Sequence, residues 1–168
     1  MERIVRDPKK LTMKSTSSWA DGWFLLTAGE FASEYNTMTV AWGGLGVMWQ
    51  MPIAMVVVRP SRYTYEFMER YSQFSLCAFP DKHRRALSYL GSHSGRDGDK
   101  IAESGLTPEK AFAIDAPVFK EANLAIECTK IYYADFDPQH FLDPAIQGSY
   151  AAGDYHRMYY GRIEAVTS

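Results

Sequence analysis

Three short segments of this sequence carry clusters of hydrogen-bond donors and cations that could hold an anionic ligand. The first reads RPSRYT, residues 59–64, and stands where a strand-like run gives way to a helix-like one. A helix N-terminus offers free N–H groups and the positive end of its dipole, and arginine adds a forked, charge-assisted donor. The segment therefore predicts a phosphate-binding turn.

The second and third segments add cations and a polar strand. SGRDGDK, residues 94–100, contains glycines that permit close backbone approach, with Arg96 and Lys100 as cations. NTMT, residues 36–39, begins a strand whose backbone could hydrogen-bond a planar heterocycle. Together the three segments could hold both a phosphate and a polar ring.

Each segment taken alone also fits an ordinary structural role. Residues 59–64 could be a helix start with solvated arginines, and residues 94–100 a surface turn. Residues 36–39 could be the outer face of a strand. The residue types by themselves leave these alternatives open.

Six strand-like segments are expected to support these candidate binding residues. They are residues 23–27, 35–42, 53–58, 74–79, 122–136 and 155–166. The segment 122–136 should place Leu124, Ile126 and Cys128 on one face, whereas the glycine run at 43–46 should interrupt the strands. Consecutive long strands without intervening helices near the end favour an antiparallel sheet or barrel.

Helices are expected between some of the strands. Ser61 should cap a helix over about 62–71, and Asp81 should cap another that Gly91 ends. Thr107 followed by Pro108 resembles a further helix start. The helices are therefore inserted into a mainly β chain.

Composition limits the class of protein. The chain has 168 residues, of which 46% are apolar and 14% aromatic, so we expect one domain over residues 1–168 with a sizeable core. The net charge of −2 provides no basic field for nucleic acid or an anionic membrane. The longest apolar run, Ile53 to Val58, is too short to span a bilayer, and residues 1–14 lack the apolar core of a signal peptide.

Several common chemistries have no motif in the sequence. There is no GxxxxGK[ST] loop, no GxSxG elbow and no dinucleotide fingerprint around the glycines at 43–46. The histidines form no HxxxH or HExxH pair, so no metal site is expected. Cys77 and Cys128 form no CxxC pair and are expected to be buried, reduced thiols of a cytoplasmic protein without a redox role.

The order of the motifs is more specific than any one of them. An NTMTVAW strand, the RPSRYT turn, FSLC, the SGRDGDK loop and a late GDYHRMYYG strand follow one another. This order resembles the flavin-reductase-like family, which includes the flavoredoxins, from about Leu26 to Val166. The resemblance implies an FMN-binding split β-barrel, an antiparallel Greek key with peripheral helices, which forms homodimers with FMN near the interface.

The resemblance also assigns roles to individual residues. The isoalloxazine edge would lie along Asn36, Thr37, Met38 and Thr39, largely through their backbone groups. The phosphate and ribityl chain would contact Ser61, Arg62, Tyr63 and Thr64. The anion site would be completed by Ser94, Arg96 and Lys100. His156 would lie near the flavin or nicotinamide pocket as the candidate catalytic residue.

The implied activity is an FMN-dependent oxidoreductase that passes a hydride from NAD(P)H through FMN to a flavin or another acceptor. One alternative is a flavoredoxin-type electron carrier that uses nicotinamide poorly. Another is a split barrel with a different ligand, such as haem bound through His156, or with none. Trp42 could approach the flavin or pack in the core or at a dimer interface.

Overall fold

The computed structural model describes residues 3–168, most of whose strands form one antiparallel sheet. Its order is β3-β2-β6-β9-β10-β5-β4, and β1 pairs with the end of β10. The strands of this sheet are β1 (Val5–Arg6), β2 (Phe24–Gly29), β3 (Tyr35–Val40), β4 (Gly43–Met48), β5 (Met51–Val58), β6 (Gln73–Ala78), β9 (Leu124–Asp135) and β10 (Arg157–Thr167). A separate pair is formed by β7 (Pro108–Glu109) and β8 (Val118–Phe119).

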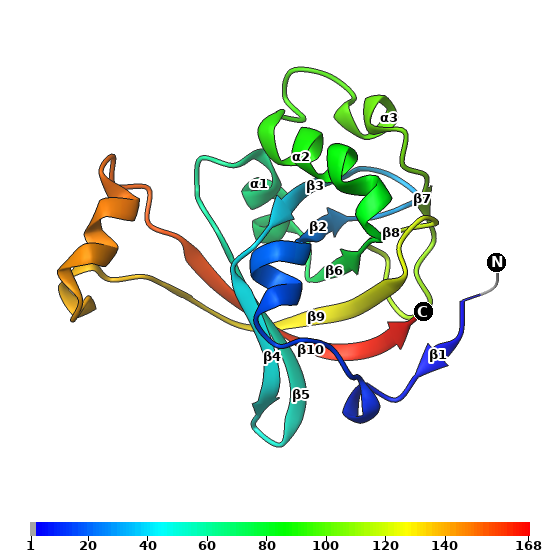
Figure 1. The fold of residues 1–168 in the computed structure, drawn as a ribbon, viewed down its shortest axis with the longest axis horizontal. Helices are drawn as coiled ribbons and strands as arrows, with labels where there is room; N and C mark the ends of the chain where they lie inside the picture. The colour runs from blue at the N-terminus through cyan, green and yellow to red at the C-terminus, as the bar shows by residue number, and fades with distance from the viewer. Residues whose placement is uncertain (1–2) are drawn as a thin grey trace.

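In the described part of the chain, three α-helices lie at the periphery of the sheet. They are α1 (Tyr63–Arg70), α2 (Arg84–Ser92) and α3 (Lys100–Ser104). In Figure 1 the helices gather near β2 and β3, while β4 and β5 extend as a hairpin on the opposite side. All six expected strands are present, so the mainly antiparallel fold class with peripheral helices is confirmed.

The sheet buries apolar side chains on both of its faces. Leu26 belongs to the cluster with Phe74 and Ile126, whereas its neighbour Leu25 packs with Leu87 of α2. This alternation follows from the two-residue period of a strand, and removal of both faces from water stabilises the sheet. As expected, Leu124, Ile126 and Cys128 share one face and contact the first cluster.

The prediction that residues 43–46 interrupt the strands is wrong, because these residues form the first part of strand β4. A Cβ added to Gly43 would lie 2.4 Å from the Trp19 ring and 2.6 Å from the Met55 carbonyl oxygen. Gly91 likewise does not end α2, since the helix continues to Ser92. Gly91 instead packs against Thr39, and a Cβ added to the glycine would lie 3.1 Å from the threonine Cβ. Both glycines allow close packing with a neighbouring element, and neither ends a strand or a helix.

Two of the predicted helix starts are also wrong. Ser61 does not cap α1, because its hydroxyl donates to Asp154, and Arg62 takes the N-cap position. Thr107 and Pro108 lead into strand β7 instead of a helix. Asp81 begins a 3₁₀ turn, Asp81–His83, that leads directly into α2.

The unexpected helix α3 begins at a side-chain cap. The Asp99 carboxylate accepts a hydrogen bond of 3.0 Å from the Ala102 amide, and Gly105 ends the helix with a φ of 74°. This helix ends the loop that carries the SGRDGDK residues, so it fixes where they lie.

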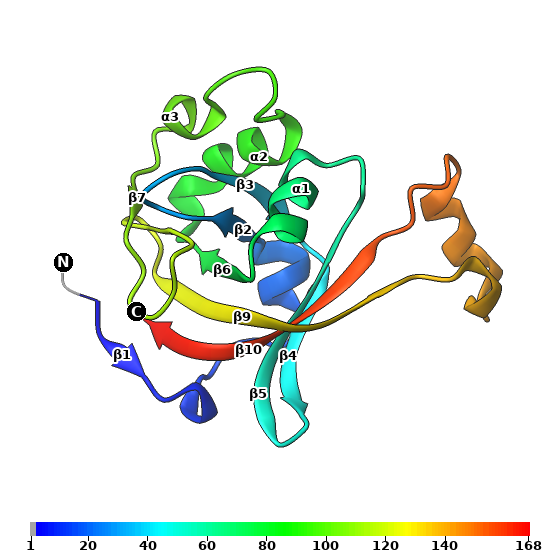
Figure 2. The ribbon, with the colours of Figure 1, turned by 180° about the vertical axis from the view of Figure 1, so that it is seen from behind.

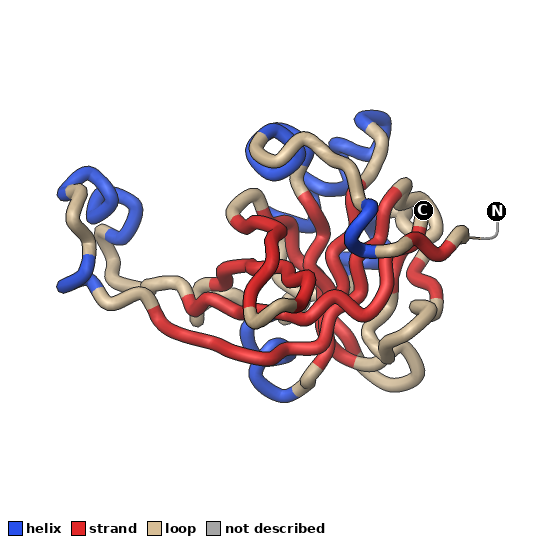
Figure 3. Tube along the Cα trace, turned by 90° about the horizontal axis from the view of Figure 1, so that it is seen from below, coloured by secondary structure: helices blue, strands red, loops and turns tan. Residues whose placement is uncertain are grey.

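An arm, residues 136–156, connects β9 to β10. It extends away from the rest of the molecule in Figures 1 and 2, and the view from below in Figure 3 shows the same projection. Two 3₁₀ turns, Pro138–His140 and Pro144–Tyr150, lie within it. The arm carries the GDYH residues back to the base of the hairpin.

None of the helices within residues 3–168 has both the length and the apolar character needed to cross a membrane.

Candidate functional site

The three candidate segments meet at one cavity of about 170 Å³, here called the anion cavity. It lies between β3, the turn before α1 and the loop between α2 and α3. Its lining residues are Asn36, Met38, Ser61, Arg62, Tyr63, Thr64, Ser92, His93, Ser94, Arg96 and Lys100. The structure thus brings together all the predicted phosphate and anion residues with two of the four predicted ring residues.

The turn into α1 is tied to β3 by polar contacts. The Arg62 amide donates to the Arg59 carbonyl at 3.0 Å, which closes the turn after β5. The Asn36 side-chain amide donates to Thr64 Oγ1 at 2.8 Å. Because Asn36 and Thr64 are both buried, this bond fixes the first turn of α1 against the strand.

Cationic side chains surround the anion cavity. Arg62 donates through its guanidinium to the Gly91 carbonyl, and Arg96 donates to the Ser61 carbonyl at 3.3 Å. Arg96 also lies 4.8 Å over the Tyr63 ring and pairs with Glu66. These contacts hold both arginines at the cavity rim.

Lys100 is the buried cation of the site. Its Nζ donates to the carbonyls of Leu90 at 2.9 Å and His93 at 2.8 Å. Burial, together with the positive charge of Arg62, lowers the pKa of Lys100 to about 8. A bound anion would offset both effects, so the chemistry of these donors fits a phosphate.

The turn already binds a carboxylate from elsewhere in the chain. Asp154 accepts a bond of 3.1 Å from the Ser61 amide and another from the Ser61 hydroxyl. Since the amide and hydroxyl both donate to one anionic group, they are arranged for anion binding. The carboxylate belongs to the GDYH segment at the end of the arm.

A second cavity, here called the ring cavity, continues along β3 and has a volume of about 180 Å³. It is lined by Met38, Thr39, Val40, Ala41, Trp42, Val57, Arg59 and His156. Met38 lines both cavities, which makes them neighbours. Within residues 3–168, β3 is an edge strand, so its outer backbone groups have no strand partner there and could bond a flat, polar ring.

Thr37 and Thr39 differ in where their side chains lie. The Thr37 hydroxyl is buried, accepts from Thr27 Oγ1 at 3.0 Å and donates to the Leu26 carbonyl at 3.0 Å. The Thr39 side chain reaches the Leu87 carbonyl of α2, while the residue still lines the ring cavity. Contact of Thr37 with a ligand would therefore have to use its backbone.

His156 reaches the ring cavity from the end of the arm. Only 9% of the residue is exposed, and its Nδ1 lies 2.7 Å from the Tyr150 hydroxyl. The Trp42 ring lies 5.0 Å from the imidazole, centre to centre. Burial and the nearby Arg59 charge lower the pKa of His156 to about 4, so it is neutral at pH 7.

Sequence reasoning assigned no individual role to several residues that shape the site. Arg59 donates to the Ser149 carbonyl at 2.8 Å and lies 5.0 Å over the Tyr150 ring, which attaches the arm beside the ring cavity. Arg59 belongs to the RPSRYT motif and Asp154 to the GDYH motif, and this membership was the sequence signal that could have identified them as site residues. Ser92 and His93 directly precede SGRDGDK.

The cysteines stand apart from this chemistry. Cys77 and Cys128 are buried free thiols, as expected. Burial raises the pKa of Cys77 to about 12 and that of Cys128 well above its ordinary value, which leaves both as unreactive thiols. Within residues 3–168, no group of three metal-ligating side chains is assembled.

Comparison with protein families gives one match over most of the chain. A family model described as the flavin reductase like domain matches residues 16–167. Among curated proteins, none matches the sequence.

Solved structures share the fold. Flavoredoxin of Desulfovibrio vulgaris (Miyazaki F) superposes with a TM-score of 0.66 at 27% identity, covering 86% of this chain and 68% of that one. An FMN-binding domain of a flavin reductases-like enzyme from Shewanella baltica gives 0.71 at 17% identity, covering 99% and 77%. An NADH:FAD oxidoreductase of Streptomyces globisporus gives 0.64 at 16% identity, covering 86% and 74%.

Proposed function

The chain belongs to the flavin reductase-like domain family, and from that premise we propose that it is an FMN-binding oxidoreductase that passes reducing equivalents from NAD(P)H to a flavin or another acceptor. We propose that residues 1–168 form one such domain.

The adjoining anion and ring cavities are the observation that carries this proposal. FMN has a doubly charged phosphate at one end and a planar ring system at the other. Arg62, Arg96 and Lys100 would bind the phosphate, and the cavity that shares Met38 would receive the ring. The order of the cavities along β3 therefore matches the order of groups in the cofactor.

A bound flavin supplies the redox chemistry, accepting a hydride from a reduced nicotinamide and releasing electrons to an acceptor. The protein binds and orients the reacting groups. The outer edge of β3 provides backbone hydrogen bonds to the ring, and Trp42 covers part of the cavity. His156 is neutral and its Nδ1 is hydrogen-bonded to the Tyr150 hydroxyl, so Nε2 is the ring nitrogen left to form a hydrogen bond without adding charge.

Self-association is part of the proposal because exposed aromatic side chains gather on the strands. Trp49, at the tip of the β4–β5 hairpin, is 55% exposed and lies 6.0 Å from Tyr132 of β9, centre to centre. Val47 in the same hairpin is 73% exposed. A second copy of the chain would remove this apolar surface from water, which supports a homodimer.

A flavoredoxin-type electron carrier is the second candidate, because the chain is similar to a flavoredoxin at 27% identity. The carrier would use the same cavities for FMN but take its electrons from a protein and react slowly with nicotinamide. A cytoplasmic location, expected from the two reduced thiols, suits both candidates and stays a prediction.

The test is a visible spectrum of the purified protein, recorded before and after addition of FMN and then after NADH or NADPH without oxygen. Bands of bound flavin that bleach rapidly with a nicotinamide would support the oxidoreductase. Bound flavin that persists in its oxidised form would favour the carrier. Absence of flavin binding would overturn both candidates.

A further inference from the structure

A cleft of about 500 Å³, here called the arm cleft, opens between the arm and the junction of β3 with β4. Most of its apolar lining comes from Trp42, Phe136, Phe141, Ile146 and Met158. The volume lies within the range of about 300–1,000 Å³ that is typical of small-molecule sites. Of the described residues, only Trp42 lines both this cleft and the ring cavity.

Trp42 thus joins the arm cleft to the proposed flavin site. Its indole lies 5.0 Å from the imidazole of His156, centre to centre. The same imidazole lies 6.4 Å from the Phe136 ring in an edge-to-face arrangement. A molecule in the arm cleft would therefore lie beside the group held in the ring cavity, with Trp42 and His156 at the boundary.

The arm cleft offers aromatic and aliphatic surface that a ligand can reach. Trp42 is 49% exposed and Ile146 is 40% exposed, while Phe136 and Phe141 are half-buried. Behind them lies the buried Tyr150 ring, which stacks on Phe141 at 5.7 Å. A flat apolar molecule would remove this surface from water and stack on the indole.

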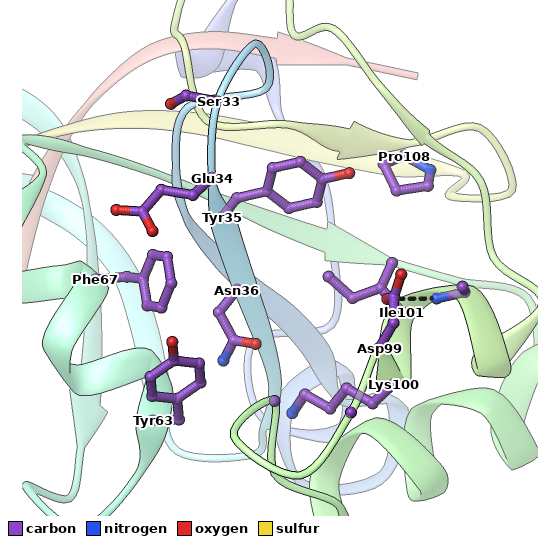
Figure 4. Close-up of a pocket in the computed structure, with 13 residues that line it drawn as sticks. Ser33, Glu34, Tyr35, Asn36, Tyr63, Phe67, Asp99, Lys100, Ile101 and Pro108 are labelled. Carbon is purple, nitrogen blue, oxygen red and sulfur yellow. Dashed lines mark hydrogen bonds between the residues drawn. The ribbon is translucent and has the colours of Figure 1, made fainter.

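The cleft between β3, α1 and α3 has a similar volume, about 530 Å³, and adjoins the anion cavity (Figure 4). Its Phe67 side chain is buried, and Arg96 lies 4.8 Å over the Tyr63 ring. Phe31 stacks on Tyr35 with 6.3 Å between the ring centres. These rings are buried or already covered by a neighbour, whereas the arm cleft keeps an accessible indole.

The arm cleft is also acidic, since the arm contains three aspartates and no lysine or arginine. Asp135 is neutralised by a two-point contact with Arg157, at 2.7 and 2.8 Å. Asp137 accepts from the Gln139 amide at 2.9 Å and lies 3.9 Å from His140, and no lysine or arginine of residues 3–168 pairs with it. Asp137 therefore places a negative charge at the cleft that repels anionic ligands.

We propose that the arm cleft binds the electron acceptor of this protein, an uncharged planar aromatic compound of the quinone class. The inference rests on the proposed function, since the electrons must come from the flavin site on the other side of Trp42. In the net reaction NAD(P)H is oxidised to NAD(P)⁺ and the quinone is reduced to the hydroquinone. The hydride supplies two electrons and one proton, the solvent supplies the second proton, and two O–H bonds form on the former carbonyl oxygens.

The test uses two naphthoquinones that differ in charge. Menadione is uncharged, whereas the hydroxyl group of lawsone is ionised at neutral pH. Their dissociation constants are measured by isothermal titration calorimetry on the full chain, with and without bound FMN. Wild-type protein should bind menadione about fivefold more tightly than lawsone in both states, because the Asp137 carboxylate repels the anion.

The charge is tested by Asp137→Asn, which keeps an acceptor for the Gln139 amide. This variant should bind lawsone more tightly, so that the two affinities lie within about twofold of each other. Asp143→Asn is the matched control, because Asp143 caps the next turn through the Ala145 amide but does not line the arm cleft. The control should keep the wild-type preference.

The apolar wall is tested by Ile146→Asp, which should weaken menadione binding by about tenfold through loss of apolar contact. Leu142→Asp, at an exposed position of the arm outside the cleft, should leave the affinity within about twofold of wild type. The oligomeric state of each variant is measured by light scattering.

Equal affinity of the wild type for menadione and lawsone would overturn the inference, and so would equal effects of Ile146→Asp and Leu142→Asp. Loss of menadione binding once FMN is bound would place the quinone in the ring cavity and also overturn it. A changed oligomeric state of Ile146→Asp with unchanged menadione affinity would assign the cleft to a second copy of the chain. Failure of FMN to bind, with menadione binding intact, would instead overturn the proposed function and leave the quinone-binding site standing.

Discussion

Asp154 and Ser61 form a two-point contact in which the carboxylate takes both the amide and the hydroxyl of the turn before α1. Ser61 lines the anion cavity, so the end of the arm places a negative charge at its edge. A ligand phosphate and the carboxylate would compete for the same donors. The arm and the ligand are therefore expected to influence one another through this serine.

Replacement of Asp154 by Asn should strengthen FMN binding by about three- to tenfold, because it removes a like charge from the edge of a phosphate site. Asparagine tolerates the left-handed backbone that Asp154 adopts, with a φ of 45°, and keeps an acceptor for the Ser61 amide. FMN titration by fluorescence checks the effect, and riboflavin, which lacks the phosphate, is the control ligand. Weaker FMN binding by the variant would show that the carboxylate supports the site instead of competing for it.

Replacement of Arg62 by Ala should weaken FMN binding by about 1–3 kcal/mol, since a charge-assisted bond to the phosphate is lost. The guanidinium also bonds the Gly91 carbonyl, so the free energy of unfolding must be measured beside the affinity. Riboflavin affinity should change little. An unchanged FMN affinity in a stably folded variant would count against the phosphate assignment.

Lys100 should make FMN binding sensitive to alkaline pH. Its pKa of about 8 in the free protein means that the ammonium loses its proton as pH rises from 7 to 9, whereas a phosphate monoester stays doubly ionised over that range. Binding should therefore be strongest below pH 8 and weaken above it. The measurement is the FMN dissociation constant at intervals between pH 7 and 9, with riboflavin as the phosphate-free control. A flat profile for FMN would remove Lys100 from the phosphate site.

His156 should make the folded state less stable in acid. Its pKa in the folded protein is about 4, below the ordinary value near 6.5, so the unfolded chain takes up the proton first as pH falls. The free energy of unfolding should thus decrease between pH 7.5 and 5, by about 1–2 kcal/mol from this residue. Urea unfolding of wild type and His156→Gln at the two pH values isolates the contribution. A pH dependence identical in both proteins would contradict the buried, neutral state.

The strands could be predicted from sequence because their signal is local. The alternation in residues 35–42 and the apolar run at 53–58 each require only neighbouring residues, and both segments form strands, as β3 and β5. The predictions for the glycines were wrong because their roles depend on contacts that are distant in the sequence. Gly43 faces Trp19 and Gly91 faces Thr39, and no local pattern shows a partner so far along the chain.

The site was predictable to the extent that its motifs are local clusters. RPSRYT and SGRDGDK do meet at one cavity, yet neither segment indicates the other by spacing. The contact of Asp154 with Ser61 depends on the return path of the arm, and the adjoining cleft depends on the position of α3. These features arise from tertiary packing, which could not be predicted from the residue types alone.

Gly161 should be intolerant of a side chain, although it lies in the middle of a strand. It occupies a register irregularity between β9 and β10, where an added Cβ would lie 2.6 Å from Phe74 Cζ and 2.8 Å from Cys128 Cβ. Both neighbours are fully buried, so Gly161→Ala should lower the free energy of unfolding by about 1–3 kcal/mol through overpacking.

Gly148→Ala is the matched control, because nothing lies within 4 Å of its added Cβ and stability should hardly change. The double variant Gly161→Ala with Phe74→Leu should lose less than the sum of the two single losses, since the shorter side chain makes room for the methyl group. Urea unfolding of the wild type, the two single variants and the double variant measures the coupling between these two positions. Additive losses would place the cost in the backbone of the bulge and not in the contact with the Phe74 ring.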